Sequence, residues 1–430
     1  MKSGRQLAFE ALLKILKDSS YSNLTVAAGL RSGELSGPER SLFTALVYGT
    51  VERKITLDYQ LSRYLKQPIR KLNRRTYAAL LLGAFQILFM DRVPSHAAIN
   101  ESVSLVKKNG AAYSSGLVNA VLHNVDRNGL QLPDESDSLP YLSVKYSCPE
   151  PLIQLWQKSY GEEATLGILE HALGAEPITI RVNTLKTDTD TLINAFAEEG
   201  VQAEPHPLVE DALVLNNLGS VEQDPLFLQG LYHVQDASSQ LCCSRLDPQP
   251  GDRVYDVCAA PGGKSFTLAE RMGDKGSVLS FDLYPKRVGL IQNGAERLGI
   301  QCIHADSGNA EEYDPERGLA DRILCDVPCS GLGIIGRKPE IRYRSLTDID
   351  NLTPVQYHIL CVSAQYCRPG GRLVYSTCSL NPAENQDVVA RFLDSHPEFA
   401  LLSEETLLPG TSHCDGFFIA VLERTERVAQ

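Results

Sequence analysis

Two cysteines of this chain occupy positions where a thiol has chemistry available to it. "LVYSTCSLNPAEN", residues 373–385, closes an apolar run on Cys378, and "ILCDVPCSG", residues 323–331, closes another just before Cys329. Polar residues or glycine follow both thiols, whereas most cysteines are small buried residues within a core. If the two runs are neighbouring strands of one sheet, their ends bring Cys329 and Cys378 together.

A pyrimidine ring would give such a pair of thiols a reaction. Carbon-5 of cytosine is a poor nucleophile, but a thiolate that adds to carbon-6 makes the ring enamine-like, so that carbon-5 attacks a methyl donor. A base must then remove the carbon-5 proton so that the thiolate leaves. A free thiol has a pKa near ~8.5, so its surroundings must favour the thiolate. Asp326, in "CDVP", is a candidate to hold the cytosine edge in either protonation state.

A glycine turn provides a candidate binding site for a cofactor. In "DVCAAPGGKSFTLAERM", Pro261, Gly262 and Gly263 form a tight turn, and a helix begins near Lys264. Backbone N–H groups at a helix start bind carboxylates or phosphates, and glycine leaves room for the ligand. The turn matches neither the dinucleotide fingerprint nor a P-loop, so by itself it is weak evidence.

Three acids strengthen the cofactor interpretation. Asp282, Asp306 and Asp326 end three successive apolar runs after the glycine turn. A single acid in such a place is often a helix cap, but three around one cleft indicate a nucleoside site. The pattern fits S-adenosylmethionine, with its carboxylate near the glycine turn, its ribose at Asp282 and its adenine near Asp306.

The elements that must position these residues form an α/β domain. From about residue 250, short apolar segments rich in β-branched residues alternate with amphipathic ones, which predicts a doubly wound, mostly parallel sheet. The predicted strands are "DRVYDVCA", "GSVLSFDL", "IQCIHAD", "DRILCDVP", "GGRLVYSTC" and "GFFIAVLE". Ligands bind beyond the carboxyl ends of such strands, where all the residues above lie.

The rest of the chain predicts two further domains. Residues 1–130 show apolar spacing of three and four, typical of helices, and "ITIRVNT" with the segments after it predicts a small α+β unit. Residues 130–151 are rich in proline and acids and are interpreted as a linker. We therefore expect a multi-domain chain with a helical domain at 1–130, a small α+β domain at 145–240 and the α/β domain at 241–430.

Composition limits the class of protein. The chain is 43% hydrophobic and 22% charged, and its longest apolar run, residues 78–90, is shorter than the ~18 residues of a membrane span. We expect no leader peptide, no membrane contact and a cytoplasmic location. The eleven cysteines include no Cys-x-x-Cys, which argues against disulfides and against a metal site.

Charge is distributed unevenly between the two ends. The net charge is −12, yet residues 1–130 carry +9 and the remainder −21. A basic head on an acidic body is typical of a protein that holds a polyanion at one end. The alternative is a solvated basic face without a partner.

Three motifs resemble a known family. "CAAPGGK", "DVPCSG" and "STCS", in this order and spacing, resemble the RNA cytosine-C5 methyltransferases of the Nol1/Nop2/Sun family. The resemblance implies that Cys378 is the nucleophile and that Cys329 assists product release. It also implies that the S-adenosylmethionine pocket is lined by Cys258, Ala259, Ala260, Pro261, Gly262, Gly263, Lys264, Asp282, Asp306 and Asp326.

The resemblance extends over the whole chain. "IRVNTLK" and "HVQDASSQL" are similar to the small RNA-binding extension of the family, and the helical head resembles the NusB RNA-binding fold. A NusB-like head joined to a Rossmann-like methyltransferase domain resembles the bacterial members that act on 16S ribosomal RNA. The resemblance implies 16S rRNA as partner, and we expect a monomer without metal. The segment "RKPEIRYR", residues 337–344, is interpreted either as lining the RNA path or as an exposed charged loop.

Two other classes of function remain as alternatives. The chain would be a binding module if its methyltransferase fold were only a scaffold, but the paired cysteines and the three acids argue against this. A DNA cytosine methyltransferase also uses a Pro-Cys cysteine such as Cys329, but it lacks the Thr-Cys-Ser cysteine found here at Cys378.

Overall fold

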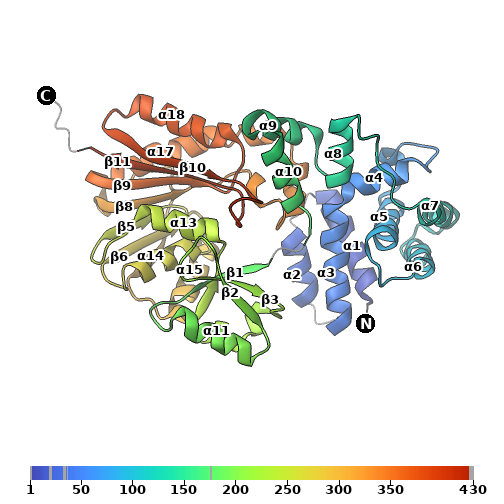
Figure 1. The fold of residues 1–430 in the computed structure, drawn as a ribbon, viewed down its shortest axis with the longest axis horizontal. Helices are drawn as coiled ribbons and strands as arrows, with labels where there is room; N and C mark the ends of the chain where they lie inside the picture. Colours follow the sequence, from blue (N-terminus) through green and yellow to red (C-terminus); the bar gives the residue numbers. More distant parts are fainter. Residues whose placement is uncertain (1, 19–21, 32–34, 36, 175–176, 426–430) are drawn as a thin grey trace. The chain divides into compact units, whose positions relative to one another are not determined.

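The chain forms two compact units. The computed structural model describes residues 2–18, 22–31, 35, 37–174 and 177–425. Met1–Ala175 and Ile335–Arg344 make up one unit, called here the helical unit, and Glu176–Ile334 and Ser345–Gln430 make up the other, called the sheet unit (Figure 1). Each is described by itself.

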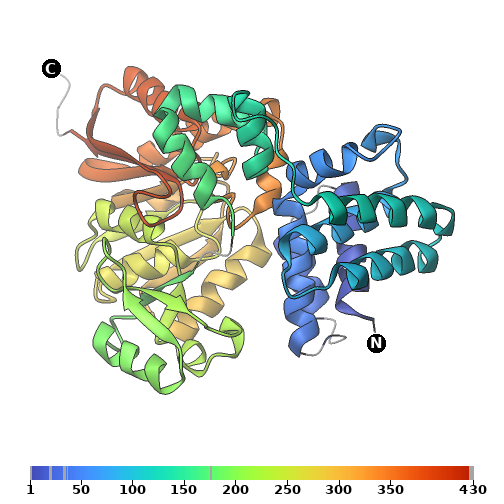
Figure 2. The ribbon, with the colours of Figure 1, turned by 45° about the vertical axis from the view of Figure 1, so that its right-hand side comes forward.

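The helical unit, whose helices are coloured blue to green in Figure 2, has a hydrophobic core formed by its helices up to α7. In α5 the most apolar run of the sequence is buried on nearly all sides, and the side chain of Asn73 caps the helix by accepting from the backbone N–H of Arg75. No helix in the described ranges is long and apolar enough to cross a membrane. The helices are α1 (Gly4–Asp18), α2 (Ser22–Arg31), α3 (Gly37–Glu52), α4 (Lys54–Ser62), α5 (Arg74–Phe89), α6 (Ser95–Lys108), α7 (Ser115–Asn128), α8 (Ser138–Tyr146), α9 (Glu150–Tyr160) and α10 (Glu162–His171).

Two segments of this unit differ from the sequence interpretation. Helix α8 lies inside residues 130–151, which the composition had marked as a linker, and it buries the side chains of Val144 and Tyr146. Both interpretations of residues 337–344 are wrong for Arg342, which is fully buried in the helical unit. Its guanidinium donates to the carbonyls of Ser147 at 3.2 Å and Ala172 at 2.8 Å, so it fastens this unit and contacts no solvent.

The sheet unit begins with a small antiparallel sheet. Within the described residues its strand order is β2-β3-β1-β4, and helix α11 covers one face. The segment "YHV" forms strand β4, and helix α13 starts after it. The elements are β1 (Ile178–Val182), α11 (Thr189–Glu198), β2 (Gln202–Pro205), β3 (Ala212–Asn216), α12 (Pro225–Leu228), β4 (Tyr232–Val234) and α13 (Ala237–Leu246).

The second sheet of this unit confirms the predicted mostly parallel architecture. Within the described residues its order is β10-β11-β9-β8-β5-β6-β7, in which β9, β8, β5, β6 and β7 run parallel, β11 is antiparallel to β9, and β10 is antiparallel to β11. The strands are β5 (Arg253–Asp256), β6 (Ser277–Asp282), β7 (Ile303–Ser307), β8 (Ala320–Asp326), β9 (Cys367–Thr377), β10 (Phe399–Leu407) and β11 (Phe417–Arg424).

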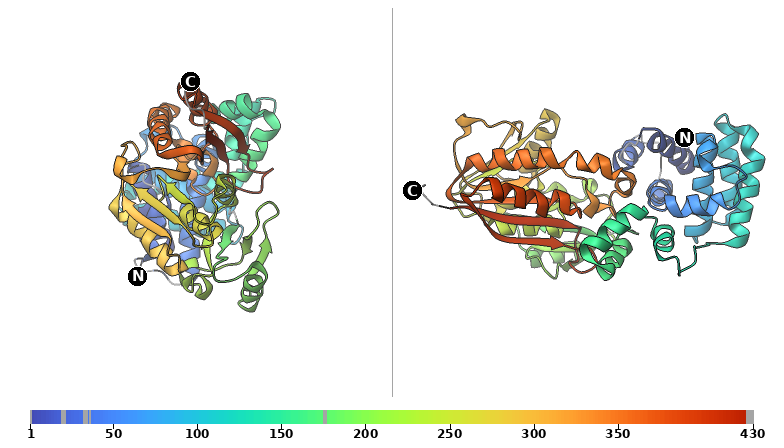
Figure 3. Two further views of the ribbon diagram at one scale, coloured as in Figure 1. Left: turned by 90° about the vertical axis from the view of Figure 1, so that its left-hand side faces the viewer. Right: turned by 90° about the horizontal axis from the view of Figure 1, so that it is seen from above.

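Helices cover both faces of this sheet, as the alternation of side chains requires (Figure 1 and Figure 3). On β5, Val254 packs in the core beneath α13, α14 and α15, and the next residue, Tyr255, packs in the core beneath α17 and α18. These helices are α14 (Gly263–Arg271), α15 (Pro285–Leu298), α17 (Thr353–Tyr366) and α18 (Gln386–Ser395), with a short α16 (Leu346–Asp350) before α17. The helices cover the two faces of the sheet, so a site can form at the carboxyl ends of the strands, between the two layers of helices.

Candidate active site

Four acids line the carboxyl edge of the parallel sheet. Strand pairing sets Asp256 of β5 opposite Ser280 of β6, and Asp306 of β7 opposite Phe281 of β6, next to Asp282. Asp326 ends β8, which neighbours β5 on its other side. The three acids singled out from the sequence thus share one edge, and Asp256 joins them.

The glycine turn connects β5 to helix α14. Gly262 precedes the first helical residue and has a φ of 111°, a conformation that L side chains rarely adopt, and the Ala260–Pro261 peptide bond is cis. Arg287, at the start of α15, donates to the Ala260 carbonyl at 2.8 Å and pairs with the Asp282 carboxylate at 3.1 Å. Arg287, which the sequence interpretation missed, therefore ties the turn to the acid that ends β6.

Lys264 faces the neighbouring strand. Its Nζ atom lies 2.8 Å from a carboxylate oxygen of Asp326, whose other oxygen accepts a hydrogen bond of 2.8 Å from Ser376 Oγ. Burial alone would lower the pKa of Lys264, but the ion pair with Asp326 outweighs burial and raises it. Lys264 is thus a fixed positive charge that links the glycine turn to β8.

Asp256 is the least solvated acid of this edge. Its Oδ2 atom accepts a hydrogen bond of 2.6 Å from Ser265 Oγ, while Oδ1 is buried without a hydrogen-bond partner. Burial raises the pKa of this carboxyl to about 7. The sequence interpretation missed Asp256 because the predicted strand, "DRVYDVCA", continued past it, whereas β5 ends at Asp256.

Asp282 and Asp306 differ in their exposure. Asp282 is buried and accepts a hydrogen bond of 3.1 Å from the backbone N–H of Tyr284 in addition to its ion pair with Arg287. Asp306 is exposed, and its Oδ1 atom accepts from the N–H of Ser307 at 2.7 Å. Both leave carboxylate lone pairs available to hydroxyl or amino donors of a ligand.

The two cysteines lie against each other beside Asp326. Their Sγ atoms are 3.2 Å apart, well beyond the ~2.05 Å of a disulfide bond, so the contact is a hydrogen bond between thiols. The hydrogen bond with Cys378 and burial raise the pKa of Cys329 well above its ordinary value. Either sulfur can be the donor of this hydrogen bond, and the raised pKa of Cys329 favours its protonated form.

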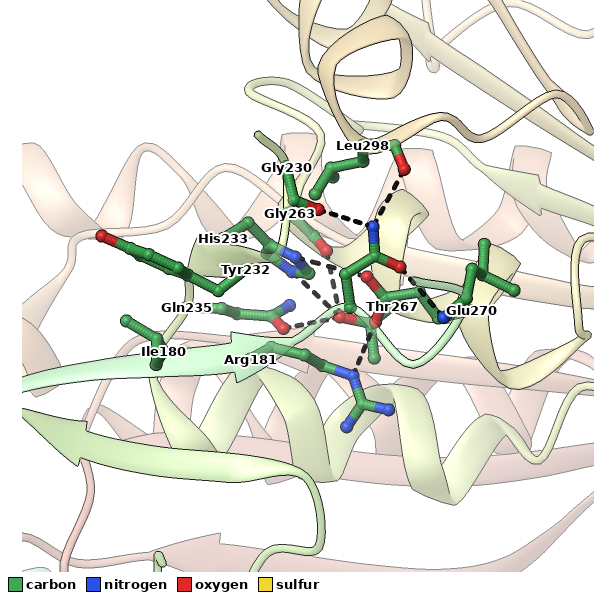
Figure 4. Close-up of polar contacts among 12 residues, drawn as sticks. Ile180, Arg181, Gly230, Tyr232, His233, Gln235, Gly263, Thr267, Glu270 and Leu298 are labelled. Atoms are coloured by element: carbon green, nitrogen blue, oxygen red, sulfur yellow. Dashed lines mark hydrogen bonds and ion pairs between the residues drawn. The ribbon is translucent and has the colours of Figure 1, made fainter. Parts of the chain in front are cut away.

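A buried ionic network holds helix α14 from the side of the small sheet (Figure 4). Arg181 of β1 donates from Nε to Glu270 Oε2 at 2.9 Å, and both side chains are almost fully buried. Thr267 donates to Gln235 Oε1 at 2.6 Å, and His233 Nδ1 lies 3.5 Å from Glu270 Oε1. The small sheet thereby fixes the helix whose first turn carries the glycine residues.

No cluster of three or more metal-ligating side chains was found in the part of the chain that is described.

A parallel sheet with a glycine turn after β5 and acids along its carboxyl edge defines a Rossmann-like, nucleoside-binding class of α/β domain.

Family comparisons identify this class more closely. Residues 243–423 match the family described as "16S rRNA methyltransferase RsmB/F", residues 2–127 match the NusB family, and residues 148–222 match the ferredoxin-like domain of RsmF/B-like methyltransferases. "Probable ribosomal RNA small subunit methyltransferase B" of Bacillus subtilis (strain 168) is 39% identical over 95% of this chain and 92% of its own length. The Vibrio cholerae protein named ribosomal RNA small subunit methyltransferase B is 33% identical over 98% and 97%.

A solved structure has the same fold over nearly the whole chain. The crystal structure of PH0851 superposes with a TM-score of 0.83 at 26% identity and covers 98% of both chains. The chain therefore belongs to the family of ribosomal RNA small subunit methyltransferases B, and it is a methyltransferase of small subunit rRNA. This confirms the fold class and the family resemblance.

Proposed function

We propose that the protein transfers a methyl group from S-adenosylmethionine to carbon-5 of a cytosine in 16S rRNA, through a covalent bond between Cys378 and carbon-6 of the base. The observation that carries this proposal is the 3.2 Å contact of Cys378 with Cys329 at the carboxyl edge of the sheet. A methyltransferase that acts on a ring nitrogen or on a ribose hydroxyl would need neither thiol.

The edge of the sheet fits the proposed cofactor. Backbone N–H groups at the start of α14 suit a carboxylate, and Asp282 and Asp306 suit ribose hydroxyls and an adenine amino group. The Oδ1 atom of Asp256 is buried and has no hydrogen-bond partner, as expected if a bound ligand donates a hydrogen bond to it. When bound, S-adenosylmethionine supplies the methyl group, and the segment from Cys258 to Lys264 with Asp326 completes its surroundings.

The two thiols have different roles in the proposed reaction. The Cys378 thiolate forms the bond to carbon-6, and carbon-5 then takes up the methyl group. A base removes the carbon-5 proton, the bond between sulfur and carbon-6 breaks, and its electron pair returns to Cys378 as the double bond between carbon-5 and carbon-6 reforms. Cys329 assists this release, and its retained proton supports the thiolate on Cys378 during attack.

The helical unit supplies the RNA-binding charge in this proposal. Its first 130 residues carry +9, and the sequence 66–75 contains five of the basic residues. Lys and Arg side chains that neutralise phosphates make binding weaken as salt is raised. A cytosine in a loop or single-stranded segment suits the site, because its base is readily unstacked.

The test is methyl transfer from labelled S-adenosylmethionine to unmethylated 16S rRNA, with identification of the product nucleoside. We expect 5-methylcytosine from the wild type and no turnover from Cys378→Ala. Cys329→Ala should attack but stall at release, leaving a protein–RNA complex that survives denaturing electrophoresis. Cys361→Ala, which changes a partly buried cysteine of α17, is the matched control and should turn over normally.

Three outcomes would contradict the proposal at different levels. An adduct that requires Cys329 and persists without Cys378 would reverse the two roles. Transfer to a different RNA would keep the chemistry and change the substrate. Absence of transfer to any nucleic acid would favour the alternative that the catalytic fold acts as a scaffold.

A further inference from the structure

One fully buried carboxylate contacts the chain directly after each cysteine. Glu384 closes the short 3-10 helix η7 (Pro382–Glu384) and has no exposed surface. Its Oε1 accepts from the backbone N–H of Ser330 at 2.8 Å, and its Oε2 accepts from Ser330 Oγ and from Ser379 Oγ, both at 2.6 Å. Ser330 follows Cys329 in the sequence and Ser379 follows Cys378.

A fourth donor joins this cluster from helix α17. Gln356 Nε2 lies 3.0 Å from Glu384 Oε1 and also 3.0 Å from the carbonyl oxygen of Pro328, the residue before Cys329. Every contact of the Glu384 side chain is therefore a donor, as a carboxylate requires. Both ends of the Cys329 segment, Pro328 and Ser330, are held by this one cluster.

The Cys378 segment is held in the same way. Asn385, next to Glu384, accepts from Thr377 Oγ1 at 2.6 Å and donates to the carbonyl of Ser379 at 2.9 Å. Tyr375 of β9 donates to the backbone carbonyl of Glu384 at 2.6 Å, which fixes η7 against the strand. The residues on both sides of Cys378, Thr377 and Ser379, thus depend on the pair Glu384–Asn385.

The chemistry of Glu384 is unusual for a residue that only fills space. A buried carboxylate is costly unless it is paired or fully hydrogen-bonded, and in the described part of the chain no lysine or arginine forms an ion pair with it. Charge-assisted hydrogen bonds are roughly twice as strong as neutral ones and are short. Such bonds fix the two segments more tightly than an apolar side chain would.

We propose that Glu384 is a positioning residue that holds the Cys329 and Cys378 segments at one common anchor and so sets the contact between the two thiols. This rests on the proposed cysteine chemistry, and Glu384 acts through Ser330 and Ser379 without touching the reacting base. Because attack and release need both thiols at one ring, a displacement of about 1 Å at either sulfur costs on the order of 10²-fold in rate.

Glu384→Gln tests this proposal with a near-isosteric change. The amide removes the charge and replaces one acceptor oxygen with a donor, so the hydroxyls of Ser330 and Ser379 must reorient to accept from it, and the charge-assisted hydrogen bonds that hold the two segments are lost. In a Cys329→Ala background, where the adduct accumulates, we expect its formation on 16S rRNA to slow about 10- to 100-fold. Affinity for S-adenosylmethionine should change less than about 2-fold, because the cofactor half of the edge does not contact Glu384.

A second readout needs no RNA and keeps the failure of this proposal distinct from that of the function. With both cysteines present, diamide oxidises two neighbouring thiols to a disulfide and is itself reduced to the hydrazine. Formation of the Cys329–Cys378 disulfide, followed by mass spectrometry, should be fast in the wild type and at least several-fold slower in Glu384→Gln. Asp387→Asn, an exposed acid three residues further on, is the matched control and should behave as the wild type.

Each outcome of these experiments distinguishes among a positioning role of Glu384, an effect of its charge alone and a failure of the proposed function. Wild-type rates of adduct and disulfide formation in Glu384→Gln would overturn the positioning role, and so would a slower adduct with unchanged disulfide formation, which would assign Glu384 an effect through charge alone. If the wild type forms no adduct, the proposed function fails, whatever Glu384 does. If Glu384→Gln does not fold, Ser379→Ala removes one donor and keeps the carboxylate, and it should slow the adduct about 3- to 10-fold.

Discussion

Two buried glutamates of the sheet unit, Glu270 and Glu384, have different kinds of partner for their negative charge. Glu270 of α14 has a guanidinium partner, Arg181, at 2.9 Å, and one of its oxygens has only His233 nearby, at 3.5 Å. Glu384 has short hydrogen bonds from neutral donors to both oxygens. The first joins the small sheet to a helix, whereas the second joins the two segments that carry the thiols.

This difference distinguishes two roles of a buried carboxylate. We call it fastening when the residue holds two elements together, and positioning when it sets the place and direction of reactive groups. An ion pair such as Arg181–Glu270 holds two elements together, and an apolar pair of similar volume often does this as well. A carboxylate that receives donors from two loops fixes directions as well as distances, and no single apolar side chain replaces it. We therefore expect substitutions at Glu270 to act on stability first and substitutions at Glu384 to act on catalysis first.

The largest effect on stability is expected from Glu270→Ala. The change leaves the buried Arg181 guanidinium with only the longer contact to Asp211, at 3.5 Å, and the loss of one partner of a buried ion pair typically costs about 3–5 kcal/mol of the free energy of unfolding. Urea unfolding of the full chain measures the loss, with the exposed Glu296→Ala of α15 as control. The double variant Arg181→Met/Glu270→Leu should recover most of it, and a double variant as unstable as the single one would contradict the fastening role.

A pH-dependent effect of intermediate size is expected from Asp256→Asn. Burial raises the pKa of Asp256 to about 7, so between about pH 4 and pH 7 the unfolded carboxyl ionises while the folded one stays protonated. Over that window the wild type loses stability that the variant keeps, and above pH 7 the difference levels off. The Tm of the variant minus that of the wild type should rise by about 5 °C from pH 4 to pH 8, and a flat difference would refute the raised pKa.

The smallest effect on stability is expected from Glu384→Gln. Its amide oxygen keeps one acceptor and its size is unchanged, so the loss should be about 1–2 kcal/mol, less than half of that for Glu270→Ala. Urea midpoints of both variants, measured beside their methyl-transfer rates, give the comparison directly. If Glu384→Gln proved the less stable and the more active of the two, the division between fastening and positioning would be wrong.

Local patterns predicted most of the fold. Runs of β-branched residues with acids at their ends mark β5, β6 and β8, and the spacing of apolar residues marks the helices of the helical unit. The pattern missed β10, an edge strand whose side chains are mostly not buried, and it missed α8 within a proline-rich stretch. In both cases packing against a neighbouring element, and not the local sequence, decides the structure.

The sequence by itself determined which residues meet at the edge. Motif order and strand ends predicted that Cys329 and Cys378 share one place with three acids, because parallel strands carry their carboxyl ends to the same side. Tertiary structure alone decided how each group behaves there. That Asp256 has a pKa of about 7, that the pKa of Cys329 is raised and that Glu384 contacts both thiol segments depend on burial and on partners distant in sequence, such as Ser330 and Glu384, which are 54 residues apart. Solvation and hydrogen bonding of this kind arise only after the chain has folded, so no spacing in the sequence encodes them directly.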